Sequence, residues 1–153
     1  MSDVSLKERI YAVNWNSSYT AYGPANDVPE LLLQLASDDH EVAKSASHKL
    51  WCGLCHQHVS MAPAGYLALP FLLEILDSAD ELIMVEILDI LWGFAQCCIE
   101  TGPNVPDYFE PTRERLIFEI PRFSLLSRHG NELISNFSSE IIKSLSQTVN
   151  SYS

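Results

Sequence analysis

Thiols and imidazoles gather in one short segment of the chain. Cys52 and Cys55 are followed by His56 and His58, and His48 stands one helical turn before Cys52. Cysteine thiolates and histidine nitrogens at such spacing can hold zinc. The segment has a helical hydrophobic pattern, however, whereas structural zinc sites usually place C-x-x-C in a tight turn. We therefore expect no metal site, and a zinc-binding protein built on this cluster is the alternative.

A second group of polar residues lies on the long apolar segment that follows. Four of them share one side of a helix in which consecutive residues turn by about 100°: Glu86, Asp89, Gln96 and Glu100. No lysine or arginine occurs between positions 50 and 112, which hold nine of the twenty acids. Such an acidic face attracts and orients a basic partner, mainly by raising its association rate. The alternative is that these acids only keep the protein dissolved.

Patterns typical of catalysis are missing from the sequence. It contains no phosphate-cradling glycine loop, no nucleophile elbow and no H-E-x-x-H motif, and its six glycines leave little material for such loops. The C-x-x-C pair also lacks the preceding strand of a thioredoxin-like redox motif. We expect a protein that is not an enzyme and needs no cofactor.

The composition further narrows the classes of protein to which the chain can belong. A chain of 153 residues that is 47% hydrophobic and 19% charged can build one folded domain. A formal charge of -11 disfavours nucleic acid as a partner and favours a basic protein. Acids interrupt the most apolar stretch, so we expect no membrane span. A polar N-terminus without a signal peptide, and four cysteines that form no secreted disulfide framework, indicate the cytoplasm.

An internal repeat organises the elements that position these residues. Segment 28–35 aligns with segment 69–76 at an offset of 41, and the same offset places Trp51 on Trp92 and Asp39 on Asp80. This period is that of HEAT and armadillo units, in which a pair of helices stacks on the next pair. The sequence therefore predicts an all-α fold, a short α-solenoid of about three HEAT-like helix pairs.

The repeat and the turn signals divide the chain into five parts. We expect an N-terminal cap, two repeats, a proline-rich loop and a C-terminal helix pair, at 1–25, 26–59, 62–101, 102–111 and 112–150. Asp39 and Asp80 should cap the second helix of each repeat, and the second of these helices should run from 81 to 99. In the C-terminal pair we expect helices at 112–128 and 131–149, with Pro121 bending the first.

Several short motifs resemble a known family. They are YGPA at 22–25, DVP at 27–29, LW at 50–51, HQ at 56–57, APA at 62–64 and PFLL at 70–73. Together they resemble a bacterial family of small HEAT-like repeat proteins, although His58 stands where relatives usually have glycine. The resemblance implies an α-solenoid with a role in protein interaction. Some members look like immunity proteins of polymorphic toxin systems, and the family offers no catalytic residues to carry over.

These observations lead to one predicted binding surface. Subtracting the 41-residue offset extends the acidic stripe onto Ser45 and His48, since the second helices of HEAT-like pairs line the concave side. Tyr108 and Phe109, in the proline-rich loop, are candidate interface anchors; closure of this loop onto the body is the alternative. We expect an immunity protein that neutralises a basic toxin domain such as a nuclease. A general HEAT-repeat scaffold is a further alternative.

Three expectations concern packing. Trp15, Tyr19 and Tyr22 should seal the open N-terminal end of the stack. The arginines of the C-terminal pair should form ion pairs with neighbouring acids. Cys97 and Cys98 are adjacent, so they cannot both face the core.

Overall fold

The computed structural model describes residues 5–55, 60–147 and 149–150, and the chain in these ranges is mostly helical. The predicted all-α class is confirmed. The α-helices, in chain order, are α1 (Leu6–Tyr11), α2 (Val28–Leu35), α3 (His40–Cys55), α4 (Pro63–Ser78), α5 (Glu81–Cys97), α6 (Phe109–Phe118), α7 (Ile120–Leu126) and α8 (Glu132–Leu145). No helix in the described ranges combines the length and hydropathy that crossing a membrane requires.

Very short strands and one 3-10 turn join some of these helices. They are η1 (Trp15–Ser17), β1 (Tyr19–Thr20), β2 (Gly23–Pro24), β3 (Glu100–Thr101) and β4 (Val149–Asn150). β1 pairs with β2 in antiparallel fashion and β3 pairs with β4 in parallel. Two-residue strands are too short to produce an alternating hydrophobic pattern, which is why the sequence did not predict them.

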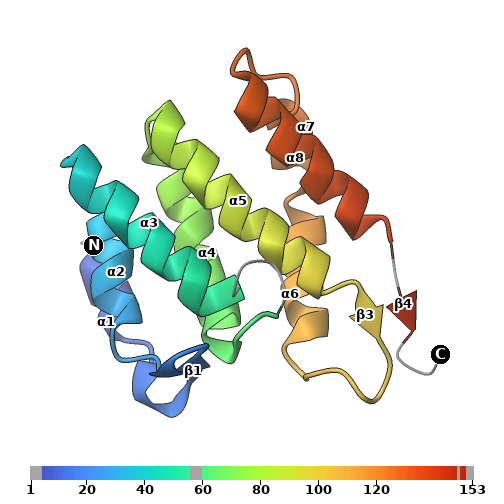
Figure 1. The fold of residues 1–153 in the computed structure, drawn as a ribbon, viewed down its shortest axis with the longest axis horizontal. Coiled ribbons are helices and arrows are strands. Elements are labelled where there is room, and N and C mark those ends of the chain that lie inside the picture. Colours follow the sequence, from blue (N-terminus) through green and yellow to red (C-terminus); the bar gives the residue numbers. More distant parts are fainter. Residues whose placement is uncertain (1–4, 56–59, 148, 151–153) are drawn as a thin grey trace, which may run out of the picture.

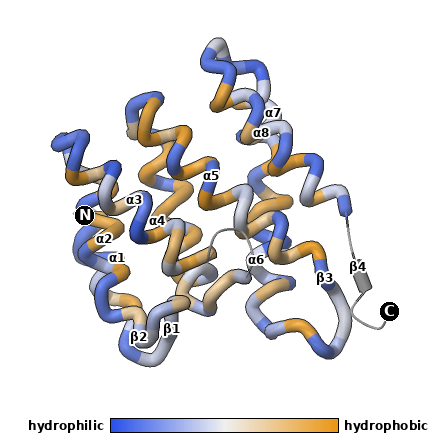
Figure 2. Tube along the Cα trace, in the orientation of Figure 1, coloured by the Kyte–Doolittle hydropathy of each residue, from blue (hydrophilic) through white to orange (hydrophobic). Residues whose placement is uncertain are grey.

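The longer helices lie in two rows. α3, α5 and α8 lie side by side and run in the same direction, with α2, α4 and α6 behind them (Figure 1). α5 is the central member, packing extensively against both α3 and α8, and α4 also packs against it. Hydrophobic residues concentrate along α4 and α5 (Figure 2), so the centre of the molecule is its core.

Polar contacts connect the N-terminal ends of the front row. The His40 ring on α3 lies 3.1 Å from the Asp80 carboxylate, which precedes α5. At the next step, the Asn131 amide donates to the Glu81 carboxylate at 3.0 Å. These contacts therefore connect the start of α3 to the start of α5, and the start of α5 to the start of α8.

The predicted helix caps are confirmed. The Asp39 carboxylate accepts hydrogen bonds from the backbone N–H groups of Glu41 and Val42 at the start of α3. The Asp80 carboxylate accepts from the N–H of Ile83 at the start of α5. Each carboxylate satisfies donors that the first helical turn leaves unpaired, which fixes where the helix begins.

The N-terminal end is closed by one of the three predicted aromatic residues. Trp15 is 4% exposed, its indole N–H donates to the carbonyl of Ile10 at 2.7 Å, and its ring lies 6.3 Å from that of Phe71. Tyr19 and Tyr22 are 56% and 73% exposed, so the prediction is wrong for them. They belong to the β1–β2 hairpin, which packs against α4 and donates a backbone hydrogen bond to Gly53 of α3.

Several helix boundaries differ from those expected, and α6 begins at Phe109, inside the expected loop 102–111. α5 ends at Cys97 rather than at residue 99, and α8 ends at Leu145 rather than at 149. The segment 112–128 is not one bent helix but two helices, α6 and α7, which meet at Glu119. Pro121 lies in the first turn of α7, where its missing N–H costs nothing, so it starts a helix instead of bending one.

Candidate partner-binding surface

The predicted acidic stripe is largely present on α5. Glu86, Asp89 and Gln96 are all partly exposed on this helix, while Gly93 among them is buried. Glu100 does not continue the stripe: α5 has already ended, and Glu100 is an exposed residue of β3. The expected position of Glu100 was wrong because helical spacing stops applying where the helix ends.

Two residues onto which the sequence extends the stripe lie on the helix next to α5. Ser45 and His48 are exposed on α3, and α3 packs directly beside α5. The His48 ring stacks on that of Trp51, with 6.1 Å between the centroids and 23° between the planes. We call Glu86, Asp89 and Gln96, together with Ser45 and His48, the α3–α5 surface.

Two acids in the stretch between positions 50 and 112, which has no lysine or arginine, form ion pairs with arginines from distant parts of the chain. Glu74 pairs with Arg9 at 2.9 Å and Asp77 with Arg122 at 3.5 Å. Two acids within α4 are thus compensated by arginines, and Asp80 contacts the His40 ring. Glu86 makes no ion pair with any residue that the structure describes. The fold therefore compensates acids near α4 and leaves the Glu86 carboxylate on the α3–α5 surface.

Tyr108 and Phe109 are not exposed anchors. The Tyr108 hydroxyl donates to the carbonyl of Met61 at 2.8 Å, and Phe109 begins α6 with its ring 5.4 Å from that of Tyr108. Both side chains are partly buried against the core. Burial, followed by the nearby Cys98 and Asp107 charges, raises the pKa of Tyr108. The loop closes onto the body, which was the alternative to the exposed arrangement.

The thiol–imidazole cluster is only partly brought together. Cys52 Sγ lies 3.7 Å from Nε2 of His48, whereas the buried Cys55 thiol donates to the carbonyl of Trp51 at 3.2 Å. His56 and His58 lie outside the described residues. Among the residues described, no group of three side chains is arranged to hold a metal ion.

The second pair of cysteines faces in two directions, as predicted. Cys98 is 1% exposed with Sγ 3.6 Å from the sulfur of Met61, and Cys97 is only partly buried. Burial raises the pKa of Cys98 to about 12. Burial and the Glu100 charge raise the pKa of Cys97 to about 11. Both thiols therefore stay protonated at neutral pH.

Ion pairs in the C-terminal region centre on Glu119, at the junction of α6 and α7. Its carboxylate contacts Arg115 and Arg122, each at 3.2 Å. Arg122 also donates to the carbonyl of Leu73 at 2.7 Å, which joins this junction to α4. The predicted ion pairing is confirmed for these two arginines.

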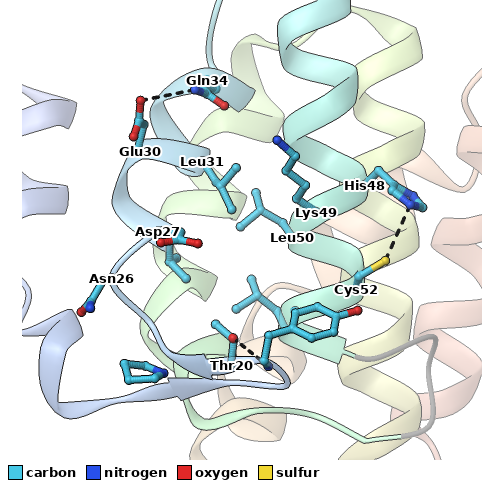
Figure 3. Close-up of a pocket in the computed structure, with 15 residues that line it drawn as sticks. Thr20, Asn26, Asp27, Glu30, Leu31, Gln34, His48, Lys49, Leu50 and Cys52 are labelled. Atoms are coloured by element: carbon cyan, nitrogen blue, oxygen red, sulfur yellow. Dashed lines mark hydrogen bonds between the residues drawn. The ribbon is translucent and has the colours of Figure 1, made fainter.

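Sequence reasoning missed a groove between α2 and α3, which we call the α2–α3 groove. Its volume is about 580 Å³. In Figure 3, Asp27, Glu30 and Gln34 come from the α2 side and His48, Lys49 and Cys52 from α3, with Leu31 and Leu50 between them. The β1–β2 hairpin contributes Thr20, Tyr22 and Pro24. The YGPA motif marks this hairpin, but sequence alone does not show that it folds beside α3.

No protein-family model, curated protein or solved structure matches this chain. Its helical architecture, the α3–α5 surface and the α2–α3 groove are therefore the basis for a functional proposal. The helical architecture defines the class of the protein: it is a small helical protein whose helices pack in two rows.

Proposed function

We propose that this chain is a non-catalytic protein-interaction module that binds a basic protein through the α3–α5 surface. The observation that carries the proposal is that the Glu86 carboxylate lies on this surface without an ion pair in the described ranges. Glu74 and Asp77 pair with arginines from other segments and Asp80 contacts the His40 ring, whereas Glu86 has no ion pair within the described ranges. An acidic side chain kept available beside Asp89 suits recognition of a basic surface.

The architecture that we propose for this module is a short α-solenoid of HEAT-like helix pairs. The parallel front row of α3, α5 and α8 supports it, as does the placement of Trp51 and Trp92, which the 41-residue offset relates (Figure 1). Both indoles are partly buried against the core, and the Trp92 ring lies 5.6 Å from Phe137 of α8. Trp51 and Trp92 thus occupy equivalent positions, where each packs within its own helix or against a neighbouring helix of the row.

The partner that we propose is a toxin domain with a basic active surface, such as a nuclease, and the chain would be its immunity protein. The resemblance of the YGPA, DVP and PFLL motifs to the small HEAT-like family supports this specific version. Electrostatics supports the mode of inhibition, because a surface that binds phosphates is positively charged and an acidic protein can cover it.

The test is a pull-down from the native cell lysate at low and moderate salt, with mass spectrometry of the eluate. The bait is compared with a Glu86→Lys/Asp89→Lys variant and with a control, Asp38→Lys/Glu114→Lys, which changes net charge equally at exposed positions. We expect a basic partner that the native chain and the control recover and that the α5 variant loses. Equal recovery by both variants, or no specific partner at either salt, would contradict the proposal.

A further inference from the structure

A nucleophile and a base lie together in the α2–α3 groove. Cys52 Sγ and His48 Nε2 are 3.7 Å apart and one helical turn apart on α3 (Figure 3). The helix therefore fixes their spacing. A thiol with an imidazole at this distance can pass its proton to the ring as the sulfur attacks an electrophile. Cys52 is also only half-buried, so the sulfur can be reached from the groove.

The β1–β2 hairpin contributes a third residue, Tyr22, to the groove. The backbone N–H of Ala21 donates to the carbonyl of Gly53 at 2.9 Å, which ties the tip of the hairpin to α3. The N–H of Tyr22 donates to the Thr20 hydroxyl at 3.1 Å. Tyr22 and Cys52 line the same groove. Desolvation, followed by the charge of Cys52, raises the pKa of Tyr22.

The other three cysteines are poorly suited to reaction. Cys55 and Cys98 are 0% and 1% exposed, and their thiols are directed to the carbonyl of Trp51 and the sulfur of Met61. Cys97 is partly exposed, but its pKa is raised to about 11. Since the thiolate is the reacting form, Cys97 should react slowly.

The walls of the groove carry opposite charges. Asp27 and Glu30 line it from the α2 side and Lys49 from α3, while Leu31 and Leu50 supply apolar surface between them. A volume of about 580 Å³ is typical of sites for small molecules. A ligand with an ammonium group at one end and a carboxylate at the other matches these walls.

We propose that Cys52 is a thiol-modification site, and that the α2–α3 groove selects a small disulfide whose arms carry both ammonium and carboxylate groups, as glutathione disulfide does. Cys52 Sγ attacks one sulfur of the ligand while its proton passes to His48. The ligand S–S bond breaks as the Cys52 Sγ–S bond forms, and the departing thiolate takes the proton from His48. One disulfide replaces another, so no separate oxidant is consumed.

The first experiment treats the folded full-length chain with oxidised glutathione and locates the adduct by peptide mass spectrometry. We expect one glutathionyl group at Cys52, formed at least about tenfold faster than at Cys97. A pKa near 11 instead of 9.0 lowers the thiolate fraction of Cys97 about a hundredfold. A thiolate of higher pKa is also a stronger nucleophile, which offsets about tenfold of this loss. A Cys52→Ser variant should not form this adduct, and a Cys97→Ser variant should form it at the native rate.

The second experiment tests selection by the groove. The rate of modification at Cys52 is measured with oxidised glutathione and with hydroxyethyl disulfide, whose arms are uncharged. The ratio of the glutathione rate to the hydroxyethyl disulfide rate in the folded chain is then divided by the same ratio in the urea-unfolded chain. This quotient should exceed one for the native chain and fall toward one in Lys49→Glu. His48→Gln should slow both reagents severalfold, because the base is lost.

Three results would overturn the proposal. Faster modification of Cys97 than of Cys52 would remove Cys52 as the site. Unchanged rates in His48→Gln would remove the base. A quotient of one in the native chain would show that the groove selects nothing, and that the reaction depends only on the exposure of the thiol.

Discussion

Glu119 shows how a single residue joins two helices to the rest of the molecule. The residue is 8% exposed and its carboxylate contacts Arg115 and Arg122. A buried carboxylate between two cations is favourable only while its partners are in place. The contact therefore marks a position where a small chemical change should have a large effect.

We predict that Glu119→Gln lowers the free energy of unfolding by about 2 kcal/mol. The amide keeps the shape of the side chain but removes the charge that faces both guanidinium groups, so that Arg122 keeps only Asp77 as an acidic partner among the described residues. The partial exposure of the arginines limits the loss. Urea unfolding followed by circular dichroism measures it. Glu114→Gln, at an exposed position of α6, is the control and should change stability little. Equal losses in the two variants would contradict this account of the junction.

The raised thiol pKa values predict a loss of stability in alkali. Cys97 and Cys98 shift from 9.0 to about 11 and about 12, so above about pH 9 the unfolded chain releases protons that the folded chain retains. Their contribution is complete below about pH 9 and declines as the pH rises further. The urea midpoint should therefore fall as the pH rises from about 9 to about 11.

A Cys97→Ala variant separates this effect from general alkaline denaturation. It removes one of the two shifted thiols at a partly exposed position, so its urea midpoint should fall less steeply over the same pH interval. A midpoint that does not change with pH in the native chain, or an identical fall in the variant, would show that the thiols do not control it.

At the residue scale, local contacts could be predicted and distant ones could not. The caps at Asp39 and Asp80 follow from hydrogen bonds within the next three residues. Tyr108 looked exposed because its partner, the carbonyl of Met61, is 47 residues away. Nothing in the loop sequence indicates that this carbonyl lies within reach of the hydroxyl.

At the scale of elements, two glycines within helices have opposite surroundings. A Cβ on Gly65 of α4 would lie 3.0 Å from Met61 Cε and 3.1 Å from Phe94 Cζ, and the Phe94 ring is fully buried. A Cβ on Gly53 of α3 would meet its nearest neighbour, Thr20 Cβ, at an ordinary 3.6 Å. Gly65 thus permits α4 and α5 to approach closely, and Gly53 does not have this role.

We predict that Gly65→Ala destabilises the protein by about 1–2 kcal/mol, because the Phe94 ring must move in a packed core. Gly53→Ala is the matched control and should be neutral or stabilising by up to about 1 kcal/mol, since alanine favours the helix. Thermal and urea unfolding of the two variants measure both effects. A stabilised Gly65→Ala variant would mean that α4 and α5 are less closely packed than described.

Helix existence was predictable at this scale, and some helix ends were not. Apolar spacing identifies α2, α3, α4 and α5, and caps mark the starts of α3 and α5, because these signals act within a few residues. The break between α6 and α7 depends on Glu119, whose role is set by Arg122 and by the carbonyl of Leu73 on α4. Such a break is determined by packing between helices rather than by the local pattern.

At the scale of the whole molecule, the fold redistributes the charge that the sequence displays. The stretch without lysine or arginine suggests a uniformly acidic region, yet Arg9 and Arg122 reach Glu74 and Asp77 from outside it. The α3–α5 surface could be outlined from the repeat, because the 41-residue offset relates α3 to α5. The α2–α3 groove could not, since it forms only when the hairpin folds beside α3.

The central claim is that the α3–α5 surface recruits a basic protein, and its most direct test is the association rate of the recovered partner at low salt. We predict that Glu86→Lys/Asp89→Lys slows association at least about tenfold, because electrostatic steering is reversed. The Asp38→Lys/Glu114→Lys control should associate at close to the native rate, and the difference should shrink as salt screens the charges. Equal rates for the two variants would contradict the claim.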